Sequence, residues 1–169
     1  MLLEMKVKGL TLDPVTSTPI VILKDVSGKT ALPIWIGLME ASAIAIELEK
    51  VQLSRPMTHD LIRNILGTLH IRLSKIVVND LKDNTFYASI YLDLGDGKEQ
   101  VIDSRPSDAI ALALRTSSPI FVDQVVIEKS RKTDIPLKGY EGETTEERKK
   151  RWEELLEKLS PEDFGKYKM

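Results

Sequence analysis

Two short segments of the chain repeat each other, and this repeat limits the folds open to it. Ser42–Leu48 reads SAIAIEL and Asp108–Leu114 reads DAIALAL, at an offset of 66 residues. Each segment has the composition of a buried helix, and each follows an apolar stretch typical of a strand. We therefore expect the 169-residue chain to contain two related halves, each made of strands followed by a helix.

Alternating apolar residues and turn signals divide both halves into similar elements. The Gly95-Asp96-Gly97 turn predicts a hairpin, and Ser27-Gly28 predicts another turn. The expected strands span residues 5–12, 20–24, 31–36, 72–81, 86–94, 100–103 and 120–128, and the expected helices span 39–50, 58–70 and 107–116. Hairpins without a long series of strand–helix–strand units indicate an α+β fold. The prediction is internally duplicated β-meander-plus-helix halves that form one compact domain, with a C-terminal helical tail.

The composition changes after Ser130, which predicts three parts in the chain. Residues 1–130 form the folded domain, residues 131–143 carry proline, glycine and charges typical of a linker, and residues 144–169 form a helical tail. The tail has one apolar stripe, made of Trp152, Leu155, Leu156 and Leu159. Because this stripe must pack on its own domain or on another subunit, we expect a homo-oligomer.

The composition also excludes several classes of site. The chain has no cysteine, so disulfides, thiolate metal sites and a cysteine nucleophile are excluded, and a reducing cytoplasm is the expected location. No apolar run has the length of a membrane span, so no membrane partner is expected. The net charge of −2 does not favour a polyanionic partner, so nucleic-acid binding requires a local basic patch.

The densest polar cluster, Asp103–Asp108, lies where a strand meets the second repeated helix. In one interpretation it is structural: Ser104 or Ser107 caps the helix, and Arg105 pairs with Asp103 or Asp108. In the other it is a site. Asp103 and Asp108 then bind Mg²⁺ or Mn²⁺, while Arg105 and the two hydroxyls hold a phosphate.

A second cluster, Arg55–Asp60, has the same order of an arginine, a proline, a hydroxyl and an acid. Thr58 is a candidate N-cap, and Asp60 falls in the first helical turn. His59 can act as a general base, a general acid or a metal ligand near neutral pH. His70 lies about 16 Å further along a continuous helix, so the two histidines cannot form one acid–base pair.

Four blocks of the sequence resemble the bifunctional nuclease domain family, in order and at ordinary spacing, over about residues 1–130. They are Leu32–Gly37 with Glu40 and Ala41, Arg55–Asp60, Asp83–Ala88 and Asp103–Ala113. The closing segment Ser160–Gly165 is similar to the tail of some prokaryotic members. The resemblance implies that the chain is an enzyme of this family, that it hydrolyses RNA and DNA, and that nucleic acid is its partner.

The leading hypothesis is metal-assisted phosphodiester hydrolysis. The candidate catalytic residues are Glu40, His59, Asp60, Asp103 and Asp108; the candidate substrate-binding residues are Arg55, Ser104, Arg105 and Ser107; and Asp103 and Asp108 are the candidate ligands of Mg²⁺ or Mn²⁺. One alternative is a non-enzymatic regulatory or protein-interaction domain, in which the polar clusters are structural helix caps and ion pairs. Another is a binding pocket for a small anion or nucleotide at the helix starts.

Overall fold

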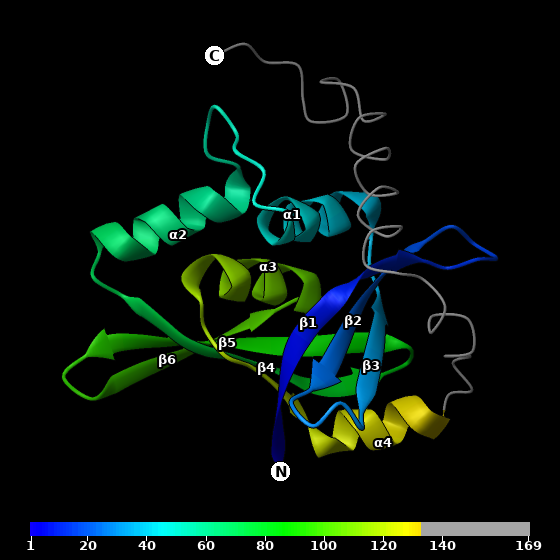
Figure 1. The fold of residues 1–169 in the computed structure, drawn as a ribbon. Coiled ribbons are helices and arrows are strands. Elements are labelled where there is room, and N and C mark those ends of the chain that lie inside the picture. The colour runs from blue at the N-terminus through cyan, green and yellow to red at the C-terminus, as the bar shows by residue number, and fades with distance from the viewer. Residues whose placement is uncertain (133–169) are drawn as a thin grey trace. The chain divides into compact units, whose positions relative to one another are not determined.

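Seven strands form a single mixed sheet in the order β3-β2-β1-β7-β4-β5-β6 (Figure 1). The structure is a computed structural model, and it describes residues 1–132. The first antiparallel meander is β1 (Leu2–Leu12), β2 (Pro19–Asp25) and β3 (Ala31–Trp35), and the second is β4 (Arg72–Lys82), β5 (Thr85–Gly95) and β6 (Lys98–Ser104). The short strand β7 (Ile120–Asp123) joins them, antiparallel to β1 and parallel to β4. The predicted duplication is thus visible as two meanders in one sheet.

Tight turns set the register of the second meander. Asp83 and Asn84 both have positive φ, at 47° and 58°, as the two central residues of a type I′ hairpin turn require. Gly95, Asp96 and Gly97 adopt positive φ in the next turn. Glycine tolerates this region without steric cost, so β6 returns directly alongside β5 and delivers Asp103 and Ser104 to the start of the next helix.

Three helices cover one face of the sheet: α1 (Leu38–Leu48), α2 (Thr58–Thr68) and α3 (Pro106–Thr116) (Figure 1). Residues 109–113 of α3 are all buried, so this helix lies at the centre of the core, and α1 and α2 both pack against it. By contrast, α2 has no fully buried residue. Among the helices of residues 1–132, none combines the length and the hydropathy that crossing a bilayer requires.

The α+β class and most predicted elements are confirmed, but the predicted strand over residues 120–128 is wrong. The strand β7 ends at Asp123, and α4 (Gln124–Lys132) follows on the opposite face of the sheet (Figure 1). The β-branched run Val125-Val126-Ile127 is typical of a strand. However, Val126, Ile127 and Ser130 are buried at helical spacing, and α4 packs on β4 and β7.

The boundary of the predicted linker also differs from the structure. Residues 131 and 132, assigned to the linker, form the end of α4. The rest of that linker and the predicted helical tail at 144–169 lie outside the described residues.

Candidate active site

A cavity of about 530 Å³ lies where the first turns of α1, α2 and α3 meet. The polar residues on its wall are Glu40, Thr58, His59, Asp103, Ser104, Arg105, Asp108 and Arg115. Apolar side chains from the same helices and from β5 line the rest, among them Met39, Met57, Ile62, Ile90 and Leu112. Polar groups from both halves of the chain thus gather beside an apolar surface, which is the usual character of a ligand site.

Four of these side chains form a continuous chain of ion pairs and hydrogen bonds. Arg105 donates from Nη1 to Oε1 of Glu40 at 2.8 Å and from Nε to Oδ2 of Asp108 at 2.7 Å. The other oxygen of Asp108 lies 2.9 Å from Nε2 of His59. Each of the three helices therefore contributes at least one of the four side chains, and these contacts connect elements that are distant in sequence.

Gly37 makes the contact between Glu40 and Arg105 possible. Gly37 is the N-cap of α1, and a side chain there would place its Cβ against the carboxylate of Glu40. Without a Cβ at this position, the Glu40 side chain folds back over the helix start and reaches Arg105.

The surroundings of Asp108 set the hydrogen-bond roles in the His59–Asp108 pair. Burial raises the pKa of Asp108, but the hydrogen bonds and the charges of Arg105 and His59 together outweigh burial and hold it below the ordinary value. Asp108 is therefore an anion that only accepts hydrogen bonds. When His59 is neutral, Nε2 therefore carries the proton and its N–H donates the hydrogen bond to Asp108, which leaves Nδ1 as the acceptor.

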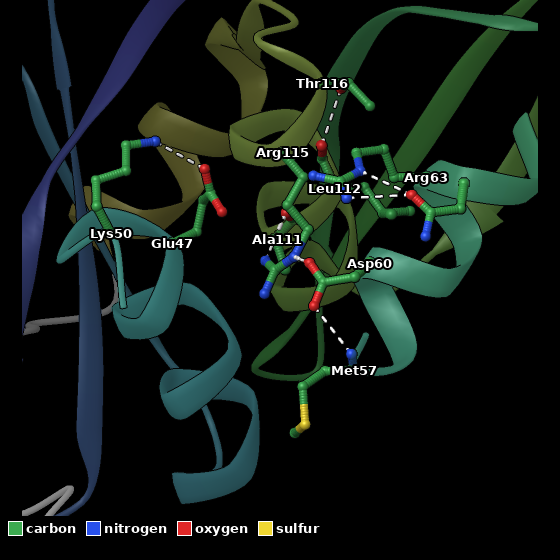
Figure 2. A network of polar contacts seen from close by, with 10 residues as sticks. Glu47, Lys50, Met57, Asp60, Arg63, Ala111, Leu112, Arg115 and Thr116 are labelled. Atoms are coloured by element: carbon green, nitrogen blue, oxygen red, sulfur yellow. Dashed lines mark hydrogen bonds and ion pairs between the residues drawn. The ribbon is translucent and has the colours of Figure 1, made fainter. Parts of the chain in front are cut away.

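Beside this chain of contacts lies a second ion pair, between Asp60 and Arg115 (Figure 2). Arg115 donates from Nε to Oδ1 of Asp60 at 2.7 Å and from Nη1 to the carbonyl of Ala111. The Arg115 side chain is only 1% exposed. Burial raises the pKa of Asp60, but hydrogen bonds from the Met57 amide and from Arg115 reverse the shift and lower it. The pair ties α2 to the central helix α3.

The helix caps differ from those predicted from the sequence. The N-cap of α2 is Met57 rather than Thr58, and Asp60 reaches back to accept a hydrogen bond from the Met57 amide at 2.9 Å. The N-cap of α3 is Arg105, with Pro106 in the first turn and no side-chain cap bond from Ser104 or Ser107. Proline at a helix start needs no amide partner, so α3 begins without a hydroxyl cap.

The structure brings six of the nine predicted site residues to the cavity wall. These six are Glu40, His59, Asp103, Ser104, Arg105 and Asp108. Asp60 lies just behind the wall, paired with Arg115. Ser107 is buried, 6% exposed, in the first turn of α3, and Arg55 lines a separate pocket.

Sequence reasoning missed Arg115, although a signal for it exists. A lone arginine at the end of an otherwise apolar, buried helix requires an acidic partner, because an unpaired buried charge is costly. Met57 was also missed; its apolar side chain carries no comparable signal.

The predicted metal ligands differ from each other in their surroundings. Both oxygens of Asp108 are engaged by Arg105 and His59, whereas Asp103 is exposed and its carboxylate has no hydrogen-bond or ion-pair partner within residues 1–132. Within the same residues no group of three or more His, Cys, Asp and Glu side chains could hold a metal ion. Mg²⁺ commonly uses one or two carboxylates together with substrate phosphates and water. On the cavity wall, Asp103 is a carboxylate that is not engaged by another side chain of residues 1–132.

Comparison with known proteins places this fold in a family. Residues 21–134 match the family model described as the bifunctional nuclease domain. The chain belongs to the bifunctional nuclease domain family. This member is 37% identical, over 164 residues, to an uncharacterized protein of Mycobacterium tuberculosis. The match covers 95% of this chain and 97% of the relative.

Plant proteins named as bifunctional nucleases are more distant. The chain is 27% identical over 107 residues to bifunctional nuclease 2 of Oryza sativa subsp. japonica and 28% identical over 109 residues to bifunctional nuclease 1 of Arabidopsis thaliana. These matches cover 62% and 63% of this chain but only 33% and 34% of the plant proteins. The chain therefore spans about a third of the length of these plant proteins.

Proposed function

We propose that this bifunctional nuclease domain protein hydrolyses phosphodiester bonds in RNA and DNA. The observation that carries the proposal is that a histidine held by an anionic aspartate and an arginine with free N–H groups line one cavity. The family and the names of its plant relatives support a nucleic acid as substrate.

His59 supplies the base in this reaction. Asp108 holds the Nε2–H of the ring, which leaves the Nδ1 lone pair to take a proton from water. The water oxygen then bonds to phosphorus, the bond from phosphorus to the leaving sugar oxygen breaks, and solvent protonates that oxygen. Because water is the nucleophile and no ribose 2′-hydroxyl is needed, the same residues can act on RNA and DNA.

Arg105 stabilises the charge that develops on the phosphoryl group. A guanidinium has five N–H groups, and Asp108 and Glu40 use one each, so three remain for phosphoryl oxygens. Glu40 and Asp108 fix the guanidinium before the substrate arrives, which lowers the cost of reorganisation. The apolar side of the cavity, with Met39 and Ile90, fits the face of a nucleobase.

A divalent cation, Mg²⁺ or Mn²⁺, forms part of the proposal. The cavity wall carries Glu40, Asp103 and Asp108 against Arg105 and Arg115, so its net charge repels a phosphodiester. Asp103, with Asp108 as a second carboxylate on the same cavity wall, would hold the cation together with the substrate. The cation would neutralise charge on the phosphoryl oxygens.

The test is hydrolysis of single-stranded RNA and DNA by the purified protein with Mg²⁺, with Mn²⁺ and with EDTA. We expect EDTA and Asp103→Asn to lower the rate through the cation, and Asp108→Asn to lower it through both the cation and His59. Full activity of folded Asp108→Asn protein contradicts the assigned roles of Asp108 and His59. Full activity in EDTA contradicts only the proposed role of the divalent cation.

A second candidate function is a non-enzymatic regulatory or protein-interaction domain. It is favoured by the mutual pairing of Glu40, Arg105 and Asp108, which satisfies these charges without a ligand. In that case the charge-removing variants lose stability, and the wild-type protein hydrolyses neither RNA nor DNA under any of the three conditions.

We also propose that the protein is a cytoplasmic homo-oligomer. The support for an oligomer is an apolar stripe on α2 and its C-cap, where the exposed side chains of Leu61, Ile65 and Leu69 follow at four-residue spacing. Sedimentation of the whole chain, and of a Leu61→Ser/Ile65→Ser variant, tests whether this stripe joins two copies. A wild-type protein that sediments as a monomer at micromolar concentration contradicts the proposed homo-oligomer.

A further inference from the structure

A second pocket adjoins the cavity and lies outside the chemistry described above. It has a volume of about 280 Å³ and is lined by the segment 51–56 between α1 and α2, together with Glu47, Asp60 and Arg63. Ile46 lines both the pocket and the cavity, and Asp60 in the pocket is paired with Arg115 in the cavity wall. The Asp60–Arg115 pair thus forms part of the partition between the two hollows.

The charges of this second pocket are unbalanced in favour of cations. Its two acids are already paired, Asp60 with Arg115 and Glu47 with Lys50 (Figure 2). Its two arginines form no ion pair within the part of the chain that the structure describes, although the charge of Arg63 helps to lower the pKa of Asp60. The guanidinium of Arg63 donates its hydrogen bonds to the neutral side-chain amide of Asn64, and Arg55 is exposed. Together with Arg115 and Lys50, the partners of the two acids, four cations therefore surround two carboxylates. This pocket therefore attracts an anion, whereas the adjoining cavity carries net negative charge.

We propose that Arg55 and Arg63 form a phosphate-anchoring subsite for a nucleotide next to the one held in the cavity. The inference rests on the proposed function and names its substrate as a polynucleotide chain rather than a mononucleotide or a small phosphodiester. One phosphodiester lies beside His59 and Arg105, and the chain continues past the Asp60–Arg115 pair to the two arginines. The subsite contributes binding energy distant from the reacting bond, so its loss weakens the binding of long substrates and leaves the hydrolysis of a small phosphodiester unchanged.

The experiment compares the whole protein with an Arg55→Ala/Arg63→Ala variant on a single-stranded 12-nucleotide oligomer and on bis(p-nitrophenyl) phosphate. Binding of the oligomer is measured by fluorescence anisotropy over a range of salt concentrations. Arg131→Ala serves as a matched control, because this exposed arginine lies in α4 on the opposite face of the sheet (Figure 1). An Arg55→Lys/Arg63→Lys variant keeps both charges.

We expect the double alanine variant to bind the oligomer about tenfold more weakly at low salt, with a slope of log K against log salt that is smaller by about 1.4, as the loss of two single-strand phosphate contacts predicts. Its hydrolysis of the small phosphodiester stays unchanged, and the lysine variant and Arg131→Ala bind like wild type. An unchanged salt slope, or an equal loss on both substrates, overturns the subsite. If wild type hydrolyses neither substrate, the proposed function fails, and the binding measurement still decides whether the subsite exists.

Discussion

Glu40 and Arg105 are 65 positions apart in the chain, yet Oε1 of Glu40 accepts a hydrogen bond from Nη1 of Arg105 at 2.8 Å. Glu40 follows the first meander and Arg105 follows the second. The contact therefore joins the equivalent junctions of the two halves, and each half alone supplies only part of the site.

Replacing Gly37 by alanine separates these two residues. The new Cβ occupies the place of the Glu40 carboxylate, whose flexible side chain moves away while the backbone stays, because φ at Gly37 is −73°. Arg105 then keeps only Asp108, and we expect kcat to fall about tenfold through the looser guanidinium. Gly67→Ala is the matched control: it meets open space inside α2, and we expect a gain of about 0.5–1 kcal/mol in stability with unchanged kcat. Equal kcat for both variants contradicts the positioning role of Glu40.

Replacement of the His59 ring is expected to remove the general base that takes the proton from water. We expect His59→Asn to lower kcat about 10²- to 10⁴-fold, with little change in the far-ultraviolet circular dichroism spectrum. His70→Asn is the control, because His70 lies beyond the end of α2, does not line the cavity, and has φ of 56°, which asparagine tolerates. A His59→Asn protein as active as the control refutes the proposed base.

The Asp60–Arg115 pair predicts an unequal cost for single and double substitution. Asp60→Ala leaves the 1% exposed Arg115 side chain unpaired and is expected to cost about 3 kcal/mol of unfolding free energy. The double variant Asp60→Ala/Arg115→Met, which removes both charges, is expected to recover much of that loss. Urea unfolding of the wild type, Asp60→Ala and the double variant measures these free energies. A double variant that is no more stable than Asp60→Ala contradicts the prediction.

Acid is expected to destabilise the domain through Asp60 and Asp108. The folded state holds the pKa of both carboxyls below the ordinary 3.8, so their stabilisation is fully present above that value and is lost as the pH falls through the lower folded pKa. Asp60→Asn and Asp108→Asn should therefore unfold with a shallower dependence on pH below about pH 4 than wild type. Thermal melts from pH 2 to pH 6 measure this, and a wild-type slope in both variants contradicts it.

The sequence was sufficient to predict the α+β class, the duplicated meanders and their helices, because these depend on local alternation, turn residues and the 66-residue repeat. It was not sufficient to predict the secondary structure at the end of the domain, where α4 lies. Val125-Val126-Ile127 suits a strand locally, and only packing against β4 and β7 makes it helical.

The candidate site was predictable as a set of residues but not as a set of contacts. His59 and Asp108 each resemble an ordinary helix start, and nothing local indicates that residues 49 positions apart lie 2.9 Å from each other. That contact depends on how α2 crosses α3, which long-range packing decides. Arg115 was detectable in principle, since its charge lies on a helix that is apolar on almost every side.

The central position of β7 has a consequence for the order of folding. β7 is the last strand of the chain, yet it lies between β1 and β4 and pairs with both. During synthesis on the ribosome the two meanders can each form early, but they stay separate sheets until Asp123 has left the exit tunnel. Until then β1 and β4 each expose an unpaired edge, and such edges promote aggregation. A nascent chain stalled before Ile120 is therefore the species most in need of a chaperone.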